Sequence, residues 1–73
     1  MDAGVAFGRV LRRLRLEAGL TQEQVGFEAD LELGQQQPSL ATVLKLAKAL
    51  EKSGQELIGL VEAEIRLGSG RKR

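Results

Sequence analysis

Residues 19–24 are Gly-Leu-Thr-Gln-Glu-Gln, and this short stretch separates one predicted helix from the next. Gly19 suits the end of a helix because glycine readily adopts the left-handed backbone conformation of a C-terminal cap. Thr21 and Gln24 form a capping-box pattern, in which each side chain accepts a hydrogen bond from the backbone amide of the other residue. A helix is therefore predicted to end at Gly19, and the next is predicted to begin at Gln22.

The segment before this stretch predicts an amphipathic helix over residues 3–18. Its apolar residues recur at spacings of three and four and form one stripe, which consists of Phe7, Val10, Leu11, Leu14 and Ala18. The arginines of the same segment lie mostly off that stripe. One face of this helix is therefore expected to pack against the rest of the chain, and the other to face water.

The segment that follows Gln22 contains no strong helix breaker before Gly34, and Pro38 cannot continue a helix. Apolar residues recur along it at helical spacing. We therefore predict one continuous helix from Gln22 to about Leu33, with no turn at residues 29–31.

Two further helices are predicted in the second half of the chain. Ser39 is the expected N-cap of a helix to about Leu50, and the Ser-Gly-Gln-Glu sequence at residues 53–56 is a second capping box. The helix that it opens is expected to end at about Leu67, before the sequence Gly-Ser-Gly. Four helices with short loops predict an all-α domain over residues 1–67, followed by a basic, disordered tail over residues 68–73.

The composition excludes most enzyme chemistry. Hydrophobic residues make up 42% and charged residues 29% of the 73 residues, as expected of one small folded domain. The chain has no Cys and no His, so disulfides, thiol nucleophiles and the commonest general base are excluded. The remaining carboxylates, lysines and hydroxyls form no recognisable catalytic group. We expect no enzyme activity, cofactor, metal or small-molecule substrate.

The net charge of +1 is weak support for a nucleic-acid partner. Basic residues gather in three groups, namely Arg9, Arg12, Arg13 and Arg15; Lys45, Lys48 and Lys52; and residues 71–73. Each group is compatible with a DNA-facing patch or with a solvated surface.

No apolar run is long enough to span a membrane, and the N-terminus lacks a signal-peptide pattern, so a cytoplasmic location without a membrane partner is expected.

Two runs of sequence resemble the Xre/Cro-like, phage-repressor-type helix-turn-helix family. FGRVLRRLRLEAGLTQEQVGFEADL, at residues 7–31, resembles its first two helices, and ELGQQQPSLATVLKLAKALE, at residues 32–51, resembles the segment after its recognition helix. Glu-x-Gly and Pro-Ser of the second run match the family pattern position by position. The resemblance covers about residues 7–58 and implies a DNA-binding domain of a transcriptional regulator.

One segment of the family pattern is missing. In the family, about eight residues that form most of the recognition helix precede Glu-x-Gly, whereas here Ala29-Asp30-Leu31 runs directly into Glu32-Leu33-Gly34. The resemblance therefore implies a small four-helix domain derived from the five-helix repressor-like fold. A natural loss, an engineered deletion and an omission of residues all remain open as explanations.

The resemblance also implies which residues touch DNA. In the family, the glutamine that opens the second helix contacts a backbone phosphate, and the partial positive charge of a helix N-terminus favours such a contact. The corresponding candidates are Thr21, Gln22, Gln35, Gln36 and Gln37. The alternative is that they are ordinary solvated residues. Phosphate contacts carry no sequence information, and the segment that would read the bases is missing. Any DNA binding is therefore expected to be weak and non-specific.

Arg15 and Glu32 match a structural ion pair of the family, which ties the first helix to the residue after the recognition helix. A bidentate arginine–carboxylate pair would explain the choice of arginine chemically. The alternative is that the missing segment moves Glu32 away and leaves both residues exposed.

The chain is also expected to form a homodimer. The last helix has a wider apolar stripe than one small core needs, and the missing segment would uncover Val25, Phe27 and Leu31. The interface candidates are Phe27, Leu57, Ile58, Val61 and Ile65. A monomer whose last helix folds back over the vacated space is the alternative.

Two functions stay open. The first is a helix-turn-helix transcriptional regulator domain whose sequence-specific reading is impaired or lost. The second is a protein-interaction or dimerisation module, or an engineered helical scaffold, that does not bind DNA.

Overall fold

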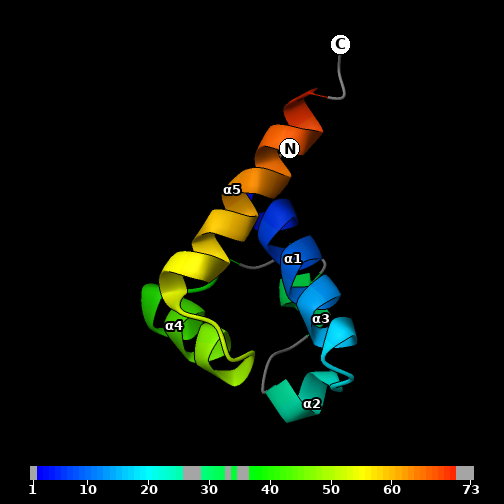
Figure 1. The fold of residues 1–73 in the computed structure, drawn as a ribbon, viewed down its shortest axis with the longest axis vertical. Coiled ribbons are helices and arrows are strands. Elements are labelled where there is room, and N and C mark those ends of the chain that lie inside the picture. The colour runs from blue at the N-terminus through cyan, green and yellow to red at the C-terminus, as the bar shows by residue number, and fades with distance from the viewer. Residues whose placement is uncertain (1, 26–28, 33, 35–36, 71–73) are drawn as a thin grey trace.

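The computed structural model describes residues 2–25, 29–32, 34 and 37–70 of the chain. In these residues it contains helices and no strand, which confirms the all-α prediction (Figure 1). The helices are α1 (Ala3–Glu17), α2 (Gln22–Val25), α3 (Ala29–Glu32), α4 (Leu40–Ala49) and α5 (Gly54–Gly70).

The boundary between α1 and α2 follows the predicted pattern. Gly19 has a φ of 71°, the left-handed conformation that favours glycine. The backbone amide of Thr21 donates to Gln24 Oε1 over 2.8 Å, and the amide of Gln24 donates to Thr21 Oγ1 over 3.1 Å. The predicted capping box is confirmed, and α2 begins at Gln22 as expected.

The caps of α4 and α5 are confirmed as well. Ser39 Oγ accepts from the amide of Thr42 over 3.2 Å. At the start of α5, the amide of Glu56 donates to Ser53 Oγ over 3.0 Å, and the amide of Ser53 donates to Glu56 Oε1 over 2.8 Å. These interactions are local in the chain, which is why the sequence predicts them.

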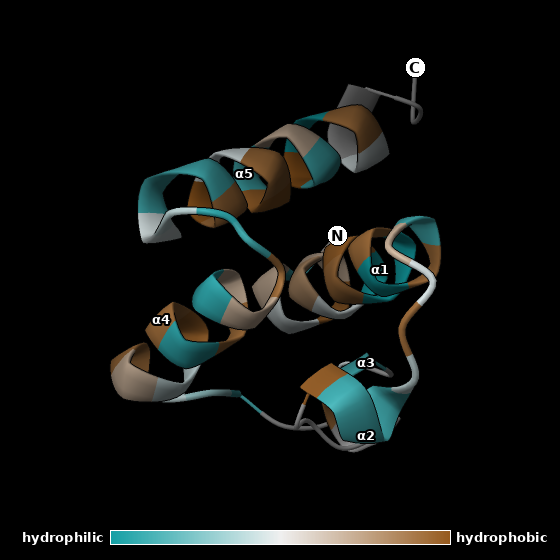
Figure 2. Cartoon of the chain, turned by 60° about the horizontal axis from the view of Figure 1, so that its bottom comes forward, coloured by the Kyte–Doolittle hydropathy of each residue, from teal (hydrophilic) through white to brown (hydrophobic). Residues whose placement is uncertain are grey.

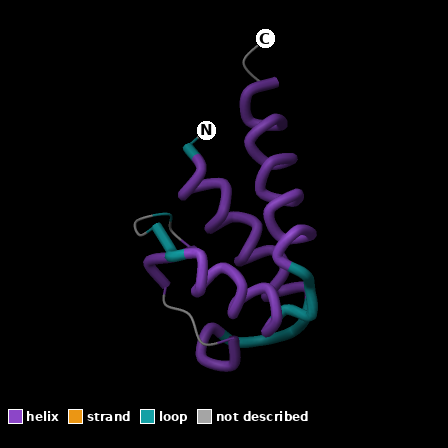
Figure 3. The backbone as a smooth tube through the Cα atoms, turned by 90° about the vertical axis from the view of Figure 1, so that its left-hand side faces the viewer, coloured by secondary structure: helices purple, strands orange, loops and turns teal. Residues whose placement is uncertain are grey.

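The last helix is longer than predicted. α5 continues through Gly70, so the prediction that it ends at about Leu67 is wrong. Glycine lowers helix propensity by about 1 kcal/mol but does not forbid a helix, and no proline interrupts this segment. The C-terminal turns of α5 extend past the N-terminal end of α1 (Figures 1 and 3). The disordered tail is predicted over residues 68–73, but residues 68–70 belong to α5. Residues 71–73 lie outside the described residues.

The prediction of one continuous helix from Gln22 to Leu33 is also wrong. The structure has two separate helices there, α2 and α3, and residues 26–28 between them lie outside the described residues. Gln22 Nε2 donates to Glu32 Oε1 over 3.2 Å, although the two residues are ten apart in sequence. In a straight helix ten residues rise about 15 Å, so Gln22 and Glu32 do not belong to one straight helix.

The core lies where α1 meets the other helices. α1 packs against α3 and α5, and α4 packs against α5. Figure 2 shows apolar and hydrophilic stretches alternating along α4 and α5, as expected of helices with one buried side. The buried apolar residues are Ala6, Phe7, Val10, Leu11, Val25, Leu31, Val43, Leu46, Ala47, Leu50, Leu57 and Val61.

This core includes two residues that the missing segment was expected to expose. Val25 is 6% exposed and Leu31 is 7% exposed. That expectation is wrong for both residues, because α2 and α3 each place an apolar side chain in the core. Phe27, the third residue of that expectation, lies outside the described residues.

No helix in the described part of the chain is long and apolar enough to cross a lipid bilayer.

Candidate nucleic-acid interface

The short helix α3 is tied to α1 by a buried ion pair. Arg15 Nε donates to Glu32 Oε2 over 2.5 Å, and Arg15 Nη2 donates to Glu32 Oε1 over 3.1 Å. Two parallel bonds between a guanidinium and a carboxylate give both strength and a defined orientation. Of the two arrangements that the sequence leaves open, the structure has the paired one.

The same pair connects α2 to the rest of the site. Arg15 Nη1 donates to the carbonyl oxygen of Leu20 over 3.0 Å, and Gln22 Nε2 donates to Glu32 Oε1. Arg12 Nη1 lies 3.8 Å from the same carboxylate oxygen. Glu32 of α3 thus contacts arginines of α1 and Gln22 of α2, and these contacts hold α2 and α3 in place.

The pKa of Glu32 reflects two opposing causes. Burial by itself raises the pKa, whereas the hydrogen bonds from Arg15 and Gln22 and the charges of Arg15 and Arg12 lower it. The lowering causes win, so the pKa lies below its ordinary value. The hydrogen bond from Arg15 to Glu32 raises the pKa of the arginine, against the opposite effect of burial. Both groups are therefore charged at neutral pH.

The described part of α3 covers one helical turn. α3 has four residues, and of these Leu31 and Glu32 are buried. Leu31 belongs to the apolar core, and Glu32 is engaged by Arg15. The side chains of Ala29 and Asp30 lie outside the described residues.

The phosphate candidates have different environments. Thr21 is exposed, and its hydroxyl caps α2. Gln22 is half-buried, with its side-chain amide directed to Glu32. Gln37 is exposed, next to Pro38. Gln35 and Gln36 lie outside the described residues.

The arginines of α1 do not share one role. Arg13 Nη1 donates to Glu64 Oε1 of α5 over 3.2 Å, and Arg9 Nη1 lies 3.9 Å from Glu64 Oε2. Arg12 has the most exposed side chain of those in the described ion pairs, at 63%. Sequence reasoning missed Glu64, because its partners lie more than fifty residues away and no local pattern marks it.

The residues predicted for the dimer interface lie in different environments. Leu57 is fully buried and Val61 is 7% exposed, so both belong to the core of a single chain. Ile65 is partly buried against that core, whereas Ile58 is 44% exposed. The expectation that Leu57 and Val61 lie in a dimer interface is therefore corrected, because α5 turns both of them towards α1 and α4. Phe27 lies outside the described residues.

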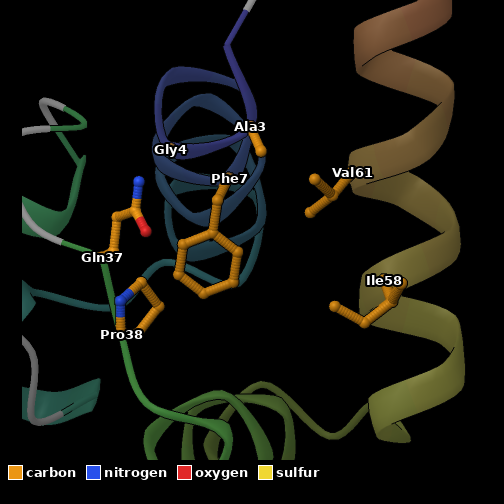
Figure 4. Close-up of a pocket in the computed structure, with 7 residues that line it drawn as sticks. All are labelled: Ala3, Gly4, Phe7, Gln37, Pro38, Ile58 and Val61. Carbon is orange, nitrogen blue, oxygen red and sulfur yellow. The ribbon is translucent and has the colours of Figure 1, made fainter.

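An open apolar hollow lies beside Ile58. It has a volume of about 210 Å³, and α1, α5 and the loop before α4 surround it (Figure 4). Phe7 and Pro38 lie on one side and Ile58 and Val61 on the other.

In the described residues, no three His, Cys, Asp or Glu side chains lie close enough together to hold a metal ion.

The comparisons with known proteins agree with this arrangement of helices. Residues 11–57 match the helix-turn-helix family, and the chain belongs to its Xre/Cro-like branch of DNA-binding transcriptional regulators. A relative from Sinorhizobium fredii (strain NBRC 101917 / NGR234), the uncharacterized HTH-type transcriptional regulator y4dJ, is 41% identical over 66 residues. The match covers 80% of this chain and 86% of that relative. No solved structure matches the chain significantly.

Proposed function

We propose that this chain is a cytoplasmic transcriptional-regulator domain that contacts the DNA backbone but has lost most sequence-specific reading. The observation that carries the proposal is the size and burial of α3. A helix of four residues, with Leu31 in the core and Glu32 in an ion pair, has little left to offer a base edge.

The physical basis of this proposal is how helix-turn-helix domains read sequence. Several side chains near the start of a recognition helix must reach base edges in the major groove. One helical turn rises only about 5.4 Å, and the turn in this chain is held against α1. Phosphate contacts are less demanding, because any exposed cation or amide donor can make them.

The exposed polar groups of the first half of the chain support a backbone contact. Arg12 is largely exposed beside α2 and α3, and Thr21, Gln22 and Gln37 remain the candidate partners of phosphate oxygens. Gln22 would have to share its amide with Glu32. We expect few phosphates to be engaged, and therefore weak binding that falls steeply with salt.

The experiment is a salt titration of binding to labelled duplexes, followed by fluorescence anisotropy. Random duplexes should all bind with similar, weak affinity, with a logarithmic salt slope of about −0.9 per phosphate engaged. Arg12→Gln should reduce the slope by about one phosphate. Arg66→Gln, an exposed arginine of α5, is the matched control and should leave the slope unchanged.

Two results would contradict the proposal in different ways. A preference of about a thousandfold for one short duplex would mean that another element reads the sequence. A lack of binding to every duplex at low salt would mean that the chain is not a DNA-binding domain at all.

The second candidate function is a protein-interaction module, and exposed apolar side chains favour it. Leu40 is 74% exposed, Leu44 is 52% exposed and Ile58 is 44% exposed. A domain of this size rarely leaves several large apolar side chains together in water. The two functions differ in whether the chain binds DNA, and we propose that the chain acts as a homodimer in either case.

A further inference from the structure

We infer that the exposed arginines of α1 form a phosphate-binding stripe, and that Glu64 of α5 keeps two of them from DNA. The stripe, called the α1 stripe below, consists of Arg9, Arg12 and Arg13. The inference rests on the proposed contact with the DNA backbone and deepens it. It extends the candidate interface from α2 along α1, and it gives one reason to expect that the native chain engages few phosphates.

The three arginines of the α1 stripe lie on one face of the helix. Residues three and four positions apart are neighbours on a helix, so Arg12 and Arg13 both lie beside Arg9. The side chains of all three are roughly half exposed or more. Each guanidinium group in such a row can donate to a phosphate oxygen without any contact to a base.

One edge of the α1 stripe adjoins the candidate nucleic-acid interface. Arg12 Nη1 lies 3.8 Å from Glu32 Oε1, the oxygen that also accepts a hydrogen bond from Gln22 Nε2. Gln22 is the first residue of α2. A DNA strand that passes the start of α2 would therefore meet Arg12 next, and the other two arginines lie within one helical turn of it.

The other edge of the α1 stripe is covered by Glu64. Arg13 Nη1 donates to Glu64 Oε1 over 3.2 Å, and Arg9 Nη1 lies 3.9 Å from Glu64 Oε2. Two arginines one turn apart thus converge on the two oxygens of one carboxylate. A phosphate offers the same kind of acceptor to a guanidinium group. Glu64 therefore occupies the place that a phosphate of DNA would take.

The contacts of Glu64 are weak enough for a competing anion to break. Ion pairs of exposed side chains contribute little to stability, because water and salt screen the charges. The arginine side chains are open to solvent, whereas that of Glu64 is only 15% exposed. An arginine can therefore leave Glu64 for a phosphate, and the release of a counterion from DNA favours this exchange. The competition lowers the affinity for DNA without abolishing it.

The test is a salt titration of the binding of Glu64→Gln to random duplexes, followed by fluorescence anisotropy. Glutamine keeps the shape of the side chain but removes its charge, so Arg9 and Arg13 become available to phosphates. The variant should bind about tenfold more tightly than the native chain at low salt, with a logarithmic salt slope steeper by about 0.9 for each arginine released. Circular dichroism should show unchanged helix content.

Glu62→Gln is the matched control. Glu62 is an exposed acid of the same helix and takes part in no ion pair among the described residues. Its substitution makes the same change in net charge and should leave the salt slope unchanged. When Arg9→Gln and Arg13→Gln are already present, the addition of Glu64→Gln should have no further effect, because the arginines that it releases are gone.

The outcomes separate this inference from the proposed function. Equal effects of Glu64→Gln and Glu62→Gln on binding would overturn the inference and leave the proposed backbone contact intact. Weaker binding by Glu64→Gln would also overturn it, because Glu64 would then orient the arginines towards DNA. If neither the native chain nor Glu64→Gln binds any duplex at low salt, the inference and the proposed function fall together.

Discussion

Gly8 of α1 lies directly against the backbone carbonyl of Glu32 in α3. A Cβ added at Gly8 would come within 2.4 Å of the Glu32 carbonyl oxygen and 2.6 Å of that of Leu31. The two helices therefore touch through their backbones, a few residues away from the Arg15–Glu32 ion pair. This close approach explains how a helix of only four residues is held in place.

Gly8→Ala should consequently destabilise the domain, although alanine favours a helix. The new methyl group has no room beside a backbone that the ion pair also holds, and such overpacking costs about 1–3 kcal/mol. The free energy of unfolding, measured in urea, gives the cost. Gly59→Ala is the control, because nothing lies within 4 Å of a Cβ at Gly59. It should stabilise the chain by about 0.5–1 kcal/mol, and equal effects of the two substitutions would refute the close contact.

Glu32→Gln should destabilise the domain at neutral pH and flatten its response to acid. The folded pKa of Glu32 lies below its ordinary value of 4.5, so its contribution is complete above that value and is lost as the pH falls through the folded pKa. Removal of one partner from a buried hydrogen-bonded pair costs about 1–3 kcal/mol. Thermal unfolding between pH 7 and pH 2 measures both effects.

Glu23→Gln is the control for this prediction, since Glu23 is an exposed acid on α2. It should leave the stability at pH 7 nearly unchanged. If Glu32→Gln and the native chain lose stability equally between pH 5 and pH 2, the carboxylate of Glu32 is not responsible for the acid response.

Glu51→Gly should stabilise the chain. Glu51 has a φ of 60°, and its amide donates to the carbonyl of Lys48 at the end of α4. A side chain in this left-handed conformation costs about 1 kcal/mol, which glycine does not incur. Lys45→Gly, in the middle of α4, should instead lose about 1 kcal/mol. A loss of stability for both variants in urea denaturation would rule out relief of backbone strain at residue 51.

Leu57→Ala should be the most damaging of these changes. Leu57 is fully buried, and truncation of a core leucine costs about 2–5 kcal/mol, a large share of the total of about 5–15 kcal/mol expected of a small domain. Leu67→Ala, at a position that is 65% exposed, should cost much less. Calorimetric melting of both variants compares them, and similar melting temperatures would show that Leu57 does not lie in the core of one chain.

The sequence by itself determined the features that depend on neighbouring residues. Hydrogen bonds between residues three apart make the caps at Thr21, Ser39 and Ser53, and the helical stripe of α1 is visible from spacing alone. The order of motifs around the Gly-Leu-Thr-Gln stretch was also enough for the family, which the match over residues 11–57 confirms.

Only the tertiary structure decided what happens between Gln22 and Gly34. Local spacing predicts one helix there, because no residue in the segment forbids it. The position of α3 instead depends on contacts from distant residues, namely Arg15 to Glu32 and the backbone of Gly8 to α3. The apolar face of α5 is a second example. Spacing alone does not tell that Leu57 faces the core while Ile58, the next residue, is 44% exposed. Burial depends on which helices meet, and that is a property of the whole fold.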